Sequence, residues 1–343
     1  MMHHQFKNLC LGFFLLSLMI LAIILGPTKI PLSILKVWEY WNLDRSIAHE
    51  IDQLTAHIFW HLRLPRVLFA ALVGGALGYC GALAQGLFRN PLADPGLLGI
   101  SAGAAAAAAF AIVILPSLSL LDMTWRPLIL PLSAFMGALM VSYLLEKSAQ
   151  KLLPGSIGGL LLMGVAFNAI IAAWIGLCTY LATDEQLRNL SFWTMGSLGA
   201  AAWILILCLL ICLVLSCARM SKIAAALNVI SLGDDVAQHI GVDIKKTRRE
   251  VIIWISLING FAVAWCGIIS FIGLLAPNMA RAMVGQNQRV VIPTSMILGA
   301  ILLVGADLLA RNLAIPTEIP VGIFTALLGG PFFLILLLKG MKS

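Results

Sequence analysis

Charged side chains are scarce in this sequence of 343 residues. Asp, Glu, Lys and Arg together make up 11% of it, against roughly 25% in soluble domains. Apolar residues make up 61%, and the mean hydropathy is +1.01. One soluble core cannot bury so much apolar surface, so much of the chain must face lipid. The composition excludes a soluble globular protein and predicts an all-α, polytopic membrane protein.

Motifs for nucleotide hydrolysis and for the common membrane enzymes are also missing. No Gly-x-x-x-x-Gly-Lys-Ser/Thr phosphate loop occurs, and neither does a His-Glu-x-x-His helix or a Gly-x-Ser-x-Gly elbow. Carboxylates within the apolar runs are too few for a proton relay. We therefore expect no enzymatic activity and no cofactor in this chain, and any ATP, with its magnesium, must be bound and hydrolysed by a separate ATPase.

Patterns for metal binding and disulfide bonding are missing as well. The seven cysteines lie within apolar runs or at their ends, without CxxC or mixed Cys/His spacing, so we expect small core residues and no metal site. The net charge of +7 does not indicate a nucleic-acid partner, because basic cytoplasmic loops give a membrane protein the same excess.

Ten segments are long and apolar enough to cross a bilayer as helices of about 20 residues. They lie near 9–26, 65–87, 97–115, 127–146, 155–181, 195–217, 250–267, 268–284, 292–311 and 321–338. The first resembles a signal peptide, but Gly26 to Lys29 offers no small-x-small cleavage site, so we keep it as a helix. We expect one transmembrane domain over residues 1–343, with an outside loop at about 27–63 and a cytoplasmic coupling segment at about 218–249.

Basic residues set the expected orientation, because cytoplasmic loops carry the excess of Lys and Arg. With the N-terminus inside and ten spans, most of the 22 Lys and Arg fall inside. These are Lys7, Arg89, Lys147, Lys151, Arg219, Lys222, Lys245, Lys246, Arg248, Arg249, Arg281, Arg289, Lys339 and Lys342. The eighth span is the weakest, yet without it Lys339 and Lys342 would lie outside. We therefore expect a multi-pass protein of the cell inner membrane with both termini cytoplasmic.

Three arginines stand on the expected outer side, where topology normally depletes positive charge. Arg63 and Arg66 begin the second span around Pro65, at a helix N-terminus that disfavours cations by about 0.3–1 kcal/mol each. They are either anchors to lipid phosphate or a docking site for an acidic partner. Arg311 lies one turn beyond Asp307 in the ninth span, so an intrahelical ion pair is the simplest interpretation of that charge.

The cytoplasmic segment contains a short sequence with the marks of a bounded helix, Ser231 to Gly241. Ser231 is the expected N-cap with Asp234 at N3, and Gly241 the expected C-terminal stop. Leu232, Val236 and Ile240 form one apolar stripe, and Asp235, Gln238 and His239 point elsewhere. The helix could lie on anionic lipid, but its acidic character fits a groove in a protein better.

These residues resemble the transmembrane subunits of ABC importers for ferric siderophores, haem and cobalamin. The resemblance runs through Arg63 to Arg66, Gln85 to Gly99, Trp193 to Leu198, the 233–241 helix, Gly273 to Pro277, Asp307 to Arg311 and Glu318 to Gly322. Residues 87–101 and 182–197 look most like the haem (hemin) permeases. Asp234 stands where the family usually has Glu, and Asn278 where it usually has His.

The resemblance implies a fold of ten helices, the type II ABC importer permease, working as a homodimer with two cytoplasmic ATPase subunits and a periplasmic substrate-binding protein. It implies that Arg63, Arg66 and Arg311 dock the binding protein. It also implies an ATPase coupling helix containing Ser231, Gly233, Asp234, Asp235, Val236, His239 and Gly241.

Some alternatives stay open at this point. The substrate could be haem, a ferric siderophore or cobalamin, and a secondary carrier or a subunit without a pathway are rival functions. No histidine falls within a span to ligate iron. His57 and His61, four residues apart, could ligate a metal in transit or could be solvated loop histidines, and Tyr79 or Met163 would be weak substitutes.

Overall fold

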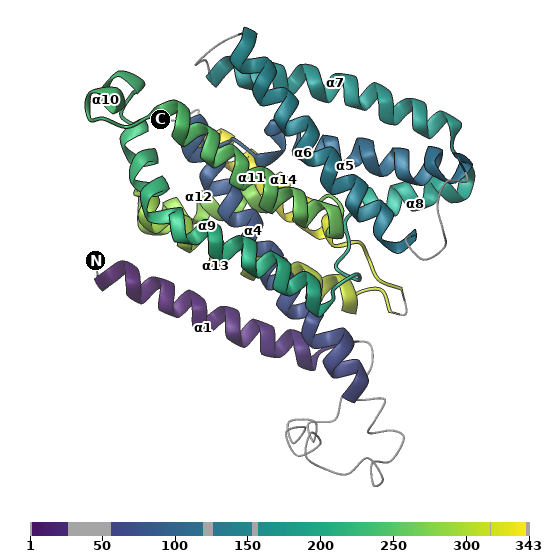
Figure 1. Cartoon of the computed structure of the whole chain (residues 1–343). Helices are drawn as coiled ribbons and strands as arrows, with labels where there is room; N and C mark the ends of the chain where they lie inside the picture. The colour runs from purple at the N-terminus through teal and green to yellow at the C-terminus, as the bar shows by residue number, and fades with distance from the viewer. Residues whose placement is uncertain (1, 27–55, 119–125, 153–156, 316, 341–343) are drawn as a thin grey trace.

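The computed structural model describes the chain except for residues 1, 27–55, 119–125, 153–156, 316 and 341–343. All the regular structure in this described part is helical, which confirms the all-α prediction (Figure 1). The α-helices are α1 (Met2–Ile24), α4 (Leu64–Phe88), α5 (Ile100–Ala109), α6 (Arg126–Leu152), α7 (Ile157–Leu181), α8 (Asp184–Thr194), α9 (Trp203–Ile230), α10 (Asp234–His239), α11 (Ile244–Cys266), α12 (Ile272–Val284), α13 (Gln288–Asn312) and α14 (Val321–Gly340).

Each of the ten predicted spans coincides with a described helix. Seven helices are long and apolar enough to cross a membrane, and Ile100–Ile114 and Val321–Ile335 are shorter apolar helices. The remaining one, α12, has only 13 residues, as its weak signal suggested. The start of the sixth span was wrong, because residues 195–202 are not helical and α9 begins at Trp203. The extra helix α8 was not predicted.

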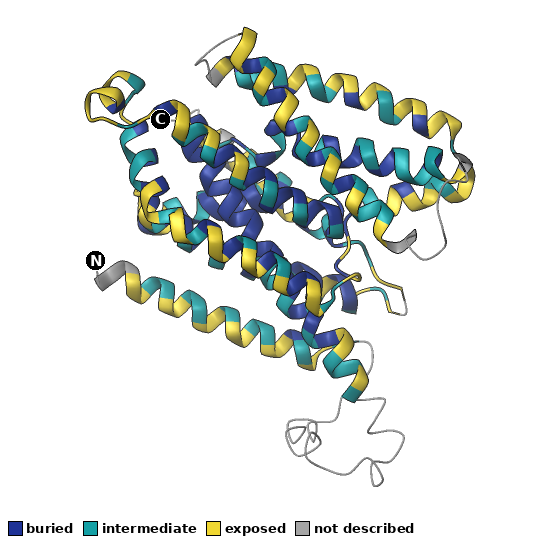
Figure 2. Ribbon diagram, viewed as in Figure 1, coloured by how far each residue is buried: buried dark blue, intermediate teal, exposed yellow. Residues whose placement is uncertain are grey.

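Helix α4 forms the centre of the molecule. Most of its 25 residues are buried, and Figure 2 shows it dark blue among α9, α11, α12 and α13. It packs against α13 with backbone nearly touching backbone. A Cβ at Gly74 would overlap the Gly299 carbonyl, and a Cβ at Gly78 would overlap that of Ser295. The small residues of α4 therefore allow this close contact between the two helices.

The outer helices carry apolar side chains on their exposed faces. In Figure 2, α1, α7 and α9 show exposed residues along much of their length. Phe13, Ile170 and Leu207 are among the exposed apolar side chains. An unpaired apolar surface of this extent is expected where a helix faces lipid.

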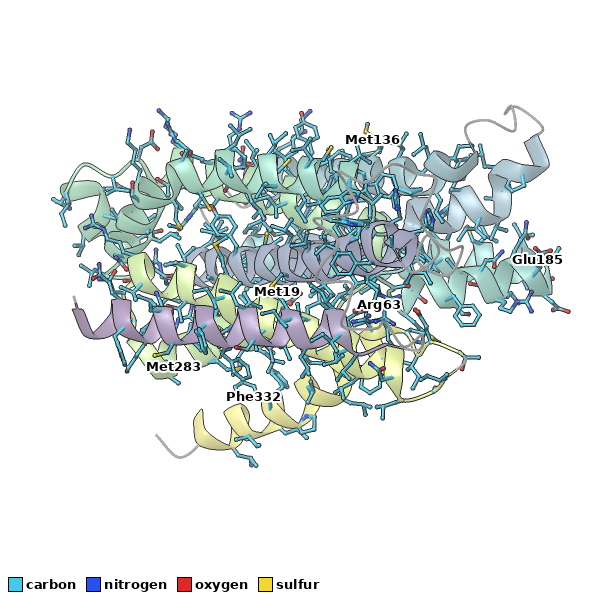
Figure 3. All side chains as sticks on the ribbon, turned by 90° about the horizontal axis from the view of Figure 1, so that it is seen from below. Met19, Arg63, Met136, Glu185, Met283 and Phe332 are labelled. Carbon is cyan, nitrogen blue, oxygen red and sulfur yellow. The ribbon has the colours of Figure 1, made fainter. Side chains whose placement is uncertain are left out.

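One end of the bundle brings together parts of the chain that are far apart in sequence. The start of α1, the end of α14 and the short helix α10 all lie toward this end (Figure 1). Figure 3 places Met283 toward it and Glu185 of α8 toward the opposite one. The Lys7 Nζ donates to the Met283 carbonyl at 2.7 Å, which fixes the start of α1 beside α12.

Candidate docking and coupling sites

Of the three arginines expected to dock a partner, Arg66 and Arg311 belong to an ion-pair network at the end of α13. Arg66 Nη2 lies 2.9 Å from Asp307 Oδ1, and Arg66 Nη1 lies 2.9 Å from Glu318 Oε2. Arg311 Nε lies 2.9 Å from Asp307 Oδ2. The expected Asp307–Arg311 pair is therefore present, and Asp307 is shared by a second arginine.

Two of these arginines also hold the end of α1. Arg63 Nη1 donates to the carbonyls of Ile23 and Ile24 at 3.0 and 3.1 Å, and Arg311 Nη2 donates to that of Ala22 at 3.1 Å. The last carbonyls of a helix lack intrahelical partners, and the helix dipole favours cations there. Figure 3 shows Arg63 at this end of α1. The guanidinium groups thus cap α1 from outside its own segment.

The dipole argument made for Arg63 and Arg66 was wrong. Residues 56–63 are already helical and lead without a break into α4, so neither arginine occupies a free helix N-terminus. The apolar body of the bundle buries Arg63 and Arg311. Their docking role stays a prediction, and the structure adds a stabilising role to it. Most of the expected outside loop, 27–55, lies outside the described residues.

Helix α10 forms where the sequence predicted it, with a different start. Its N-cap is Gly233, whose φ of 126° is open to glycine. Ser231 still has helical dihedral angles at the end of α9, and its hydroxyl donates to the Asn228 carbonyl at 2.6 Å. The predicted capping by Ser231 was therefore wrong, and Asp234 is the first helical residue rather than N3. Gly241 does end the element, with φ of 87°.

The two faces of α10 differ sharply. Ala237 packs with Ile230 and Ile244 in a small buried cluster. The predicted apolar stripe faces outward, with Leu232, Val236 and Ile240 at 68%, 43% and 61% exposure. Asp235 and His239 are exposed beside it. An exposed apolar stripe on a short, well-ordered helix suits contact with another protein.

Asp234 points the other way, into the chain. Its Oδ2 accepts from Arg248 Nη2 at 2.8 Å, and its Oδ1 is ion-paired with Arg89. Burial, and then the positive charge of Arg248, lower the pKa of the Arg89 guanidinium. From the sequence, Arg89 and Arg248 were predicted only to lie on the inside of the membrane. Only the fold brings them to Asp234, because they lie on α4's end and on α11.

Asn278, where the resemblance to the family led us to expect a histidine, contacts the chain segment after α4. Its Nδ2 donates to the carbonyls of Pro91 and Leu274, both at 2.8 Å. One amide nitrogen can serve two carbonyls because it carries two protons. Asn278 thus fixes residues 89–99 against α12 without a titratable group.

Three of the side chains considered for contact with iron, those of His57, His61 and Tyr79, contact other side chains of this chain. The rings of His57 and His61 stack with centroids 4.4 Å apart, and no group of three or more metal-ligating side chains occurs among the described residues. Tyr79 is fully buried in α4, with its hydroxyl 2.5 Å from the Ser216 hydroxyl. Its oxygen is therefore engaged inside this chain.

These features define a class of protein: a polytopic membrane protein, with a bundle of apolar helices and a structured element exposed at one end. Comparison with known proteins then gives the family. The model of the FecCD transport family matches residues 9–339, and the chain belongs to that family. It is accordingly a transport subunit, the membrane permease of an ABC importer.

Several relatives are similar over nearly the whole chain. The hemin transport system permease protein HmuU of Yersinia pestis is 41% identical over 97% of this chain and 96% of its own length. The vitamin B12 import system permease protein BtuC of Vibrio cholerae is 35% identical, covering 90% of each. The Fe(3+) dicitrate transport system permease protein FecD of Escherichia coli is 34% identical over 93% and 94%.

A solved structure agrees with the fold. An inward-facing metal-chelate type ABC transporter superposes with a TM-score of 0.80 at 27% identity, covering 98% of this chain and 99% of that one. The fold of this chain is thus similar to that of the solved transporter over nearly its whole length.

Proposed function

We propose that this chain carries haem, or a related iron chelate, across the cytoplasmic membrane as the permease of an ABC importer. The observation that carries the proposal is the 41% identity to a hemin permease over nearly the full length of both chains. A ferric-siderophore or cobalamin permease is the second candidate, since relatives named for vitamin B12 and Fe(3+) dicitrate are 35% and 34% identical.

The proposed assembly contains two copies of this chain, two cytoplasmic ATPase subunits and a periplasmic binding protein. The exposed stripe of Leu232, Val236 and Ile240 is the proposed ATPase contact, because the chain itself has no phosphate loop. Arg63, Arg66 and Arg311 are the proposed contact for acidic groups of the binding protein. Both termini are proposed to be cytoplasmic, on the side of α10.

Transport by the reconstituted complex tests the function directly. The chain would be placed in vesicles with its ATPase and binding protein, and uptake of haem, a ferric siderophore and cobalamin would be measured with and without ATP. We expect ATP-dependent uptake of haem and at least tenfold slower uptake of the others, a difference of about 1.4 kcal/mol in the rate-limiting barrier. Faster uptake of cobalamin than of haem would overturn the choice of substrate.

A variant in the exposed face of α10 tests the proposed contact with the ATPase. Val236→Asp adds a charge to a stripe proposed to be buried by the ATPase, so we expect loss of ATP-driven uptake. Insertion and folding should be retained, because Val236 is exposed in the chain itself. Unchanged uptake in this variant would remove α10 from the proposed ATPase contact.

A further inference from the structure

The ion-pair cluster behind α10 occupies a junction between three parts of the chain. Asp234 is the first residue of α10, Arg248 lies in the first turns of α11, and Arg89 is the C-cap of α4. One carboxylate therefore joins α10 to two of the helices that enter the bundle. Asp235, the next residue, is exposed, so the two neighbouring carboxylates have different surroundings.

The backbone at Arg89 indicates that its side chain is needed. Arg89 is left-handed, with φ of 52° and ψ of 32°, and it is one of two described non-glycine residues with positive φ. Helices commonly end in this conformation with glycine, which adopts it without steric cost. An arginine at this position loses that freedom and gains a guanidinium that reaches Asp234.

Residues 89–99 connect this cluster to two further helices. The Pro91 carbonyl accepts from Asn278 of α12, and Pro95 packs on Gly273 at the start of the same helix. Leu97 lies against α7 so closely that a Cβ at Gly164 would overlap its carbonyl. A displacement of Arg89 would therefore be transmitted to α7 and α12, because residues 89–99 are closely packed against both helices.

We infer that Asp234 is a positioning residue, which tethers α10 to Arg89 and to the 89–99 segment, and that it is not itself a contact for the ATPase. In this arrangement the exposed stripe of α10 receives the partner, and the Asp234–Arg89 pair passes its displacement to α7 and α12. The part of this inference that concerns transport rests on the proposed function. The tether itself is a property of this chain alone.

Hydrogen exchange of the purified permease in detergent tests the tether without any partner. Asp234→Asn should speed amide exchange in residues 234–241 by about 3- to 10-fold, the size expected when a partly buried charged hydrogen bond is lost. Exchange in residues 89–93 should rise too, because coupling between two sites is reciprocal. Asp235→Asn is the matched control and should leave both segments at the wild-type rate.

A double-mutant cycle and a conservative variant complete this test. Arg89→Gln should speed exchange in α10 when Asp234 is present and add less than twofold in the Asp234→Asn background. Asp234→Glu keeps the carboxylate and should restore most of the protection. Wild-type exchange in Asp234→Asn, or effects of the two substitutions that simply add, would overturn the tether.

The assembled transporter gives a readout that a merely stabilising pair would not change. In Asp234→Asn, the number of haem molecules imported per ATP hydrolysed should fall severalfold, while the affinity for the ATPase stays within about twofold of wild type. A large loss of ATPase affinity, with normal exchange in the isolated chain, would make Asp234 a direct contact and refute the inference. If no ATPase binds at all, the proposed function fails and the exchange data still decide the tether.

Discussion

At the scale of single residues, buried charge dominates the end of the bundle where Asp307 lies. Asp307 is 2% exposed and shared by Arg66 and Arg311, whereas the Glu318 side chain is 45% exposed. A charge at the centre of a bilayer costs roughly 2.5–3.5 kcal/mol on insertion scales. The network offsets this cost by pairing Asp307 with Arg66 and Arg311. Arg63 and Arg311 also satisfy the last carbonyls of α1.

Neutralising the two carboxylates should therefore have unequal effects on stability. Asp307→Asn removes the shared partner of buried Arg311 and half-buried Arg66 and should lower the free energy of unfolding by about 3–5 kcal/mol. Glu318→Gln should cost about 0.2–1 kcal/mol, as for an exposed pair. Unfolding midpoints of the two variants in detergent would check this, and equal midpoints would contradict it.

The docking prediction can be separated from this stabilising role by the sign of the effect. Replacing Arg63, Arg66 and Arg311 together by Ala should slow association with an acidic binding protein, chiefly at low salt, because electrostatic steering is screened beyond roughly 10 Å at 0.1 M salt. That variant also loses stability, so Glu318→Gln is the decisive companion. It releases Arg66 from a competing carboxylate and should speed association by about two- to threefold at low salt.

Stopped-flow association at two salt concentrations would measure both variants. Unchanged association of Glu318→Gln at low salt would limit Arg66 to its role inside the chain.

At the scale of elements, the contact between α4 and α13 depends on the absence of side chains. Gly74 and Gly78 bring the two helix backbones together at Gly299 and Ser295. Without a hydrophobic driving force between helices in lipid, such close van der Waals packing is a main source of association. The short helix α10 differs from α4, because it carries an exposed apolar stripe that no other part of the described chain covers.

Adding one methyl group to α4 should thus be costly. Gly78→Ala would place its Cβ on the Ser295 carbonyl and should destabilise the bundle by roughly 1–3 kcal/mol through overpacking. Gly12→Ala in α1 is the matched control, since none of the described atoms lies within 4 Å of its Cβ. It should be neutral or stabilising by about 0.5–1 kcal/mol, from helix propensity. Thermal unfolding of both variants in detergent would test this, and similar shifts would contradict it.

At the scale of the whole molecule, the two ends of the helical bundle carry different elements. The start of α1, the end of α14 and α10 share one end (Figure 1), and α8 lies toward the other (Figure 3). The coupling role proposed for α10 and the basic residues counted around it together predict that this end faces the cytoplasm.

This orientation is open to a direct test. A reporter fused after Ser343 should be active only in its cytoplasmic form, and a reporter fused before Met1 should behave in the same way. The physical reason is the clustering of Lys and Arg at the inside ends of the spans. Activity only outside the membrane would contradict the ten-span orientation.

The sequence by itself determined the class of this protein, its ten apolar spans and the presence of a helix before Gly241. These depend on local information: hydrophobic length for the spans, glycine conformation and alternating polarity for α10. The sequence missed α8, a short amphipathic helix, because its capping box of Thr183 and Gln186 stood in a segment treated as a loop. A search for such boxes could have found it.

The tertiary structure alone decided which charges meet. Arg66 and Asp307 are 241 residues apart, and Arg89 reaches Asp234 across several spans. A motif shows only neighbours along the chain, so the Asp307–Arg311 pair could be predicted. Arg66 was expected to be a lipid anchor or a docking group, and Asp234 part of an ATPase coupling helix. A charge enclosed by apolar helices requires a partner close to it inside the chain. Only the packing of α1, α4, α11 and α13 determines which partner that is.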